Sequence, residues 1–102
     1  MNDRVAWLEA RSTGAPAALR HRVRQYLDSI PKRPDLPADL AAAAGRALEA
    51  TIQGGGSRAA ALDLLAADAL VTLALQAQAE EDPAGLAAFA RQLRDAEARR
   101  HD

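Results

Sequence analysis

The segment from Arg58 to Ala79 constrains the fold more than any other part of this sequence. It predicts one long helix with apolar side chains on more than one side. One stripe at helical spacing consists of Leu62, Leu65, Ala69 and Leu73, and a second group, roughly opposite, consists of Leu64, Val71 and Leu75. A helix with two apolar faces must be covered on both, either at the centre of its own bundle or between subunits.

The composition favours an all-α fold with a core of aliphatic side chains. The chain has 102 residues, of which 49% are hydrophobic and only 3% aromatic. A chain of this length buries roughly two thirds of its unfolded surface in one domain. Alanine has the highest helix propensity and loses no side-chain entropy, so a chain rich in alanine and leucine indicates helices rather than strands.

Prolines, glycines and capping residues divide the chain into a compact bundle of about five helices within a single domain. The proline-rich stretch 31–37 predicts a stiff spacer. The run Gly54-Gly55-Gly56-Ser57 predicts a turn with Ser57 as the N-cap of the long fourth helix, although its composition is also that of an engineered linker. Asp82-Pro83 predicts a helix start. The predicted helices span residues 3–12, 16–30, 38–53, 58–81 and 83–98.

The sequence carries no signal of export or membrane insertion. The start Met-Asn-Asp-Arg-Val lacks a basic segment followed by an apolar run, so we expect a cytoplasmic protein. Residues 59–79 are about long enough to span a bilayer, but Asp63, Asp68 and further polar residues interrupt them, so we expect no membrane span. Basic residues are almost all arginine, which we interpret as the codon bias of a GC-rich bacterial genome.

Charge is distributed unevenly along the chain. Residues 1–33 have a net charge of +4 and residues 34–102 a net charge of −5. The run Arg20-His21-Arg22-Val23-Arg24 provides basic side chains on the polar side of a helix. No aromatic platform or base-reading element accompanies them, so we expect no specific nucleic-acid binding. Instead, this basic face can pair with the acidic second half, within the chain or across a dimer.

A ribbon of polar residues follows the fourth helix at a spacing of four residues. It consists of Asp68, Thr72 and Gln76, with Asp63 about 140° away from Asp68. Either one carboxylate pairs with an arginine and the ribbon marks an exposed or specificity-setting strip of the helix, or the ribbon lines a ligand pocket. A buried Asp68 needs a cationic partner. The expected candidates are Arg46, Arg91 and Arg94.

The sequence offers no set of residues for catalysis or metal binding. There are no cysteines, which excludes disulfides, thiolate metal sites and cysteine nucleophiles. His21 belongs to a polar helix face and His101 to the terminal tail. No Glu-x-x-His pair exists to build a di-metal site in a bundle. We therefore predict no catalytic residues, no bound metal and no cofactor.

These observations predict a non-catalytic helical interaction or adaptor module that self-associates. We expect the interface to consist of Leu64, Val71 and Leu75, with Gln78 at its edge. Two alternatives remain open. The bundle can bind an apolar small molecule in a cavity beside the polar ribbon, or it can be an accessory subunit of a larger complex. The sequence does not distinguish self-association from association with another protein.

Overall fold

The computed structural model describes residues 3–100, which form five α-helices and one 3₁₀ turn. The prediction of an all-α bundle is confirmed, and within this range there is no strand. The helices are α1 (Asp3–Ala10), α2 (Ala17–Asp28), α3 (Leu36–Gln53), α4 (Arg58–Glu81) and α5 (Leu86–Arg100), with the 3₁₀ turn η1 (Pro83–Gly85) before α5.

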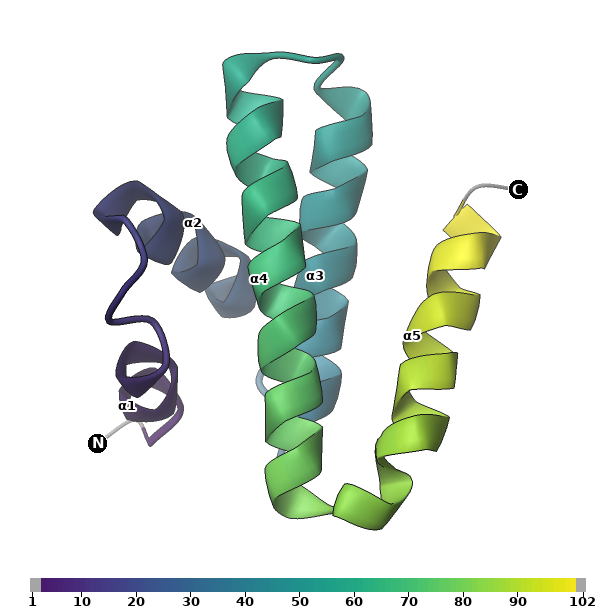
Figure 1. Cartoon of the computed structure of the whole chain (residues 1–102). Helices are drawn as coiled ribbons and strands as arrows, with labels where there is room; N and C mark the ends of the chain where they lie inside the picture. The colour runs from purple at the N-terminus through teal and green to yellow at the C-terminus, as the bar shows by residue number, and fades with distance from the viewer. Residues whose placement is uncertain (1–2, 101–102) are drawn as a thin grey trace.

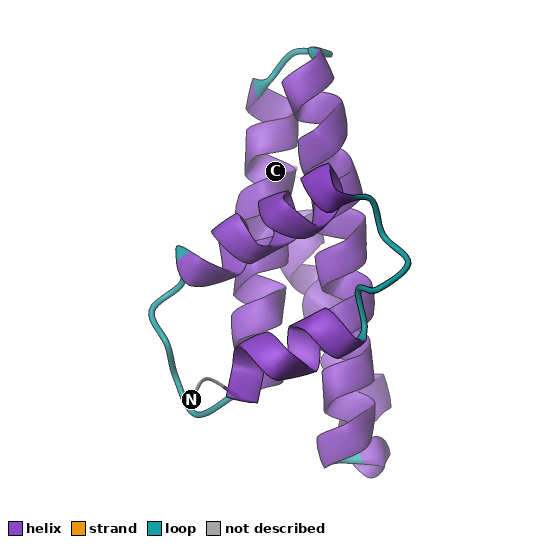
Figure 2. Cartoon of the chain, turned by 90° about the vertical axis from the view of Figure 1, so that its left-hand side faces the viewer, coloured by secondary structure: helices purple, strands orange, loops and turns teal. Residues whose placement is uncertain are grey.

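The long helices α3 and α4 form an antiparallel hairpin at the centre of the molecule (Figure 1). The short helices α1 and α2 lie across one side of this hairpin (Figure 2). Helix α5 lies on the opposite side and tilts away from the hairpin toward its own C-terminal end (Figure 1). The two faces of the hairpin are therefore covered very differently.

Alanine builds most of the interface between α3 and α4. Leu40 of α3 and Leu70 of α4 are fully buried. The buried alanines around them are Ala43, Ala44 and Ala47 on α3, and Ala66, Ala67, Ala74 and Ala77 on α4. Because the alanine side chain is a single methyl group, the two helices can pack closely, and many small contacts add up to a substantial attraction.

The buried side of α4 differs from the predicted leucine stripe. Leu73 is buried, but the side chain of Leu65 is 55% exposed. Helix α3 packs against the alanine-rich side between the two predicted apolar groups. The prediction weighted large side chains, whereas close approach of two helices favours small ones.

The first helices are shorter than predicted, and the third begins earlier. The predicted bounds 58–81 of the fourth helix agree with the structure, whereas α1 ends at Ala10 and α2 at Asp28. Helix α3 begins at Leu36 within the predicted linker, because the Asp35 carboxylate accepts a hydrogen bond of 3.1 Å from the Ala38 N–H. Aspartate is a strong N-cap, and proline is tolerated in a first turn.

The glycine turn between α3 and α4 requires its glycines. Gly55 and Gly56 have φ angles of 58° and 83°, in the left-handed region that glycine adopts without strain. A Cβ atom on Gly54 would lie 2.5 Å from the Ala60 Cβ atom. Ser57 then caps α4, with its Oγ accepting a hydrogen bond of 3.0 Å from the Ala60 N–H.

Within residues 3–100, one helix, α4, is long and apolar enough to cross a membrane, judged by length and composition alone. Core helices of soluble proteins share this property. In the structure, α4 contacts α2, α3 and α5 and is the central helix of the bundle.

Candidate interaction surface

An open apolar groove of about 670 Å³ lies between the α3–α4 hairpin and α5. Helix α4 lines it with Leu64, Asp68, Val71 and Leu75, at the spacing of one helix face. Helix α5 faces them with the apolar residues Phe89, Leu93 and Ala96 and with the charged residues Arg94 and Glu97. Helix α3 contributes Ala38, Ala41, Ala42, Gly45 and Leu48, among others.

Three of the four predicted interface residues lie together in this groove. The side chain of Leu64 is 52% exposed and that of Val71 is 37% exposed, while Leu75 is half-buried. Gln78 does not line the groove; its amide nitrogen donates a hydrogen bond of 3.2 Å to the Asp82 carbonyl at the end of α4. The second apolar face of α4 is therefore only partly covered by the chain itself.

The polar ribbon of α4 does not form one surface. Asp68 lines the groove, whereas Thr72 and Gln76 line a small depression of about 190 Å³ on the side of α1 and α2. Residues four apart on a helix differ by about 40°, so the ribbon turns away from the groove within two steps. The three residues are not brought into one pocket.

The expectation of a buried Asp68 paired with an arginine is wrong within the chain. Asp68 is exposed, and its carboxylate forms no ion pair or hydrogen bond with any residue of the described range. Thr72 does bond to Asp68, but its hydroxyl donates to the backbone carbonyl, at 3.1 Å. Asp68 is thus an exposed charge at the edge of the apolar stripe formed by Leu64, Val71 and Leu75.

The buried carboxylate of α4 is Asp63, which pairs with the basic helix α2. Asp63 Oδ1 accepts hydrogen bonds of 2.8 Å from Arg22 Nη1 and of 2.8 Å from the Tyr26 hydroxyl. Burial, and then the Asp63 carboxylate, raise the pKa of Tyr26. The interpretation that one of the two carboxylates pairs with an arginine is confirmed for Asp63. The same contact confirms that the basic face of α2 pairs with the acidic second half within the chain.

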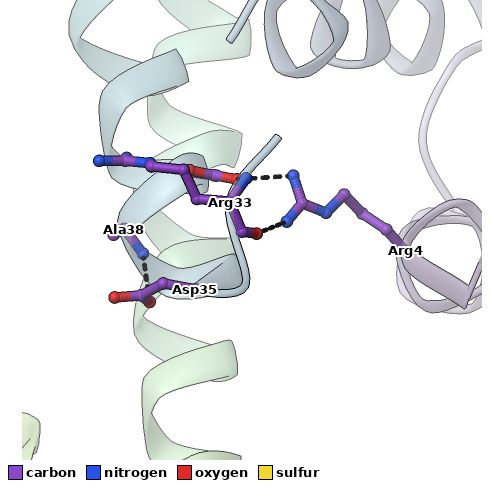
Figure 3. A network of polar contacts seen from close by, with 5 residues as sticks. Arg4, Arg33, Asp35 and Ala38 are labelled. Carbon is purple, nitrogen blue, oxygen red and sulfur yellow. Dashed lines mark hydrogen bonds and ion pairs between the residues drawn. The ribbon is translucent and has the colours of Figure 1, made fainter. Parts of the chain in front are cut away.

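A second buried carboxylate, Asp39, was not found by the sequence reasoning. Its side chain is fully buried and accepts hydrogen bonds of 2.7 Å from Arg4 Nη1, 2.7 Å from Arg33 Nε and 3.0 Å from the Arg33 N–H. Burial alone raises the pKa of Asp39, but the hydrogen bonds from Arg33 and Arg4 outweigh it and lower the pKa. Figure 3 shows Arg4 reaching Arg33 from α1. The sequence signal for this cluster was that Asp39 lies in the first turn of a helix, six residues after Arg33.

Helix α1 is held to the C-terminal end of α4 by a third polar cluster. Arg11 Nη2 lies 2.7 Å from Glu80 Oε1 and 2.8 Å from Glu80 Oε2, and its guanidinium lies 4.2 Å from the centre of the Trp7 ring. The Trp7 indole N–H donates to Glu80 at 3.2 Å. These bonds, from Arg11 first and then Trp7, lower the pKa of Glu80. The N-terminal helices thus dock by three polar contacts, on the side away from the groove.

Helix α5 is held by much less. None of its residues from Leu86 to Arg99 is fully buried, and Leu86, Phe89, Leu93 and Ala96 are half-buried. Its one ion pair among residues 3–100 is a separation of 3.9 Å between the neighbours Arg94 and Asp95. One side of the groove, the α3–α4 hairpin, therefore belongs to the buried core, whereas the other side, α5, has no fully buried residue from Leu86 to Arg99.

Residues 3–100 contain no group of three or more histidine and carboxylate side chains placed to hold a metal ion. His21 is exposed on α2, and His101 lies outside the described residues. Comparisons with models of known protein families, with curated proteins and with solved structures found no match.

Proposed function

We propose that this protein is a non-catalytic interaction module that self-associates through the groove between the α3–α4 hairpin and α5. The observation that carries the proposal is the half-open apolar stripe of α4, in which Leu64 is 52% and Val71 37% exposed. Full burial of a leucine or valine side chain contributes about 1.5–3 kcal/mol. Covering this stripe is therefore favourable, and a contiguous apolar surface of this kind is typical of a protein contact.

The shape of the groove favours an elongated protein partner. The groove follows α4 from Leu64 to Leu75, roughly 16 Å along the helix axis. It is open to solvent along this length. Amphipathic helices bind in such grooves with side chains spaced three, four and seven residues apart.

Light scattering of the purified protein, from micromolar to submillimolar concentration, tests the proposal. We expect the wild-type mass to rise above that of one chain with concentration. Val71→Arg places a charge in the groove and should weaken association about tenfold or more, since 1.4 kcal/mol corresponds to a factor of ten. Leu65→Arg is the matched control: Leu65 is on the same helix and is 55% exposed, but it does not line the groove.

Circular dichroism should show that both variants keep the helical content of the wild type, because both side chains already reach solvent. A wild-type protein that remains a single chain at the highest concentration would overturn the proposal. Equal effects of the two arginine substitutions would also overturn the assignment of the surface to the groove.

Binding of an apolar small molecule is the second candidate function. The observation in its favour is the volume of about 670 Å³, which lies in the usual range of ligand sites, roughly 300–1,000 Å³. Native mass spectrometry distinguishes the two functions. A bound small molecule on single chains, lost in Val71→Arg, would support ligand binding and replace the self-association proposal.

A further inference from the structure

The small depression of about 190 Å³ lies where α1 and α2 meet α4, on the side of the hairpin that Figure 2 shows. It brings together residues from two sequence features that do not line the groove. Arg20 and Val23 belong to the basic run of α2, and Thr72 and Gln76 belong to the polar ribbon of α4. The two features, far apart in the sequence, thus share one surface.

The size and the apolar lining of the depression suit a small molecule with a short aliphatic group. Val23 and Leu73 are buried in its lining, and Ala15, Leu19 and Ala69 are half-buried. Its volume is below the roughly 300 Å³ at which drug-sized ligand sites begin. It corresponds to roughly six water molecules at their liquid volume. A helix of another protein does not fit in this space.

The charged side chains of the depression are both arginines, and no carboxylate lines it. Glu80 already neutralises Arg11, with oxygen–nitrogen distances of 2.7 and 2.8 Å to Arg11 Nη2. Arg20 is exposed and forms no ion pair with any residue from 3 to 100. A guanidinium can bind a carboxylate through two parallel hydrogen bonds, so Arg20 supplies a free anion-binding group.

Gln76 adds a second free donor to the depression. The hydroxyls of Ser12 and Thr72 are used within the chain, because they donate to the carbonyls of Leu8 and Asp68 at 2.8 and 3.1 Å. The side-chain amide of Gln76, in contrast, has no hydrogen-bond partner in the described part of the chain. The depression therefore combines one unpaired cation, one unpaired amide and an apolar lining.

We infer that this depression is a binding site for a small organic carboxylate. The carboxylate binds Arg20 and Gln76, and the aliphatic tail packs against Val23 and Leu73. The positive charge selects against neutral molecules, and the apolar lining selects against inorganic anions. The site is separate from the groove and does not depend on the proposed self-association.

A titration with sodium butanoate at constant ionic strength, followed by nuclear magnetic resonance, tests the inference. We expect a dissociation constant on the order of 1 mM, because a ligand with so few atoms makes few contacts. The largest shifts should be those of Arg20, Leu73 and Gln76. Trp7 fluorescence gives a second readout, since this single tryptophan lies 4.2 Å from the guanidinium of Arg11.

Three further probes separate the roles of charge and tail. Acetate has the charge with a much shorter tail, inorganic phosphate has charge without a tail, and 1-butanol has the tail without the charge. Each should bind at least about fivefold more weakly than butanoate. Phosphate that binds as tightly as butanoate would reduce the site to a charge contact and overturn the inference. Equal binding of 1-butanol would overturn the role of Arg20.

Arg20→Gln should weaken butanoate binding about tenfold or more, while circular dichroism stays that of the wild type because Arg20 is exposed and unpaired. Arg58→Gln is the matched control: Arg58 is an exposed arginine at the start of α4 that does not line the depression. It removes the same charge and should bind butanoate like the wild type. Equal losses in the two variants, or shifts that map to Leu64 and Val71 of the groove, would overturn the inference and leave the proposed function untouched.

Discussion

Arg4 and Asp39 are separated by 35 residues in the sequence, yet Arg4 Nη1 and Asp39 Oδ2 lie 2.7 Å apart. The Asp39 side chain is fully buried, and that of Arg4 is 13% exposed. Arg33 completes the cluster with two further hydrogen bonds to Asp39. This contact fixes α1 and the linker against the start of α3, and so it joins the N-terminal third of the chain to the central hairpin.

Asp39→Asn should lower the free energy of unfolding by about 2–4 kcal/mol. The substitution keeps the size of the side chain but removes the buried negative charge that accepts the hydrogen bonds from Arg4 and Arg33. Urea denaturation followed by circular dichroism measures the change. Asp28→Asn is the matched control, because Asp28 is exposed and lies 3.8 Å from Arg24. Its effect should stay within about 0.5 kcal/mol.

The contribution of Asp39 should disappear in acid. Its pKa in the folded protein lies below the ordinary value of 3.8, so the folded state favours the ionised carboxylate. The resulting stability is present above pH 4 or so and is lost as the pH falls through the folded-state pKa. Urea denaturation at a series of pH values should show the wild type and Asp39→Asn converging in this acidic range. A constant difference down to the lowest pH would contradict the ionic contribution.

Titration of Tyr26 should report its contact with Asp63. The pKa of Tyr26 is raised from 10.0, first by burial and then by the Asp63 carboxylate. Tyr26 is the single tyrosine of the chain, so the ultraviolet absorbance of phenolate follows this residue alone. We expect a midpoint above pH 10, and a lower midpoint in Asp63→Asn.

The raised pKa of Tyr26 also makes the folding stability depend on pH, in the direction opposite to that of Asp39. Because the raised pKa favours the neutral hydroxyl in the folded state, its stabilisation is complete below pH 10 and declines as the pH rises toward the folded-state pKa. Tyr26→Phe should remove this decline. A phenolate midpoint at or below pH 10 in the wild type would show that the hydroxyl does not bond to Asp63 in solution.

Leu70→Ala should be one of the most destabilising truncations in α4. Leu70 is fully buried at the contact with α3, and removal of a buried leucine side chain costs about 2–5 kcal/mol. Leu65→Ala, on the same helix, removes a side chain that is 55% exposed and should cost less than about 1 kcal/mol. Thermal or urea denaturation of the two variants gives the comparison. Similar losses in both would show that the leucine side of α4 is buried in solution.

The candidate surface was largely visible in the sequence. Leu64, Val71 and Leu75 repeat at helical spacing, and local geometry alone places them on one face of α4. What covers that face could not be predicted, since the position of α5 depends on the short connection at Pro83–Gly85 and on packing at a distance. The burial of Asp63 and the exposure of Asp68 could not be predicted either. Both are carboxylates on one apolar helix, and only the position of α2 decides which of them is buried.

The sequence by itself determined the helices, because helix formation depends on local propensity and on capping residues that act within one turn. The start of α4 after Ser57 is an example. The tertiary structure decided which side of each helix became the core. Close packing of α3 on α4 favoured the alanine side, which left Leu64 and Val71 open toward the groove. Burial is a property of neighbouring elements, so it follows from their arrangement in space and not from the order of residues along one helix.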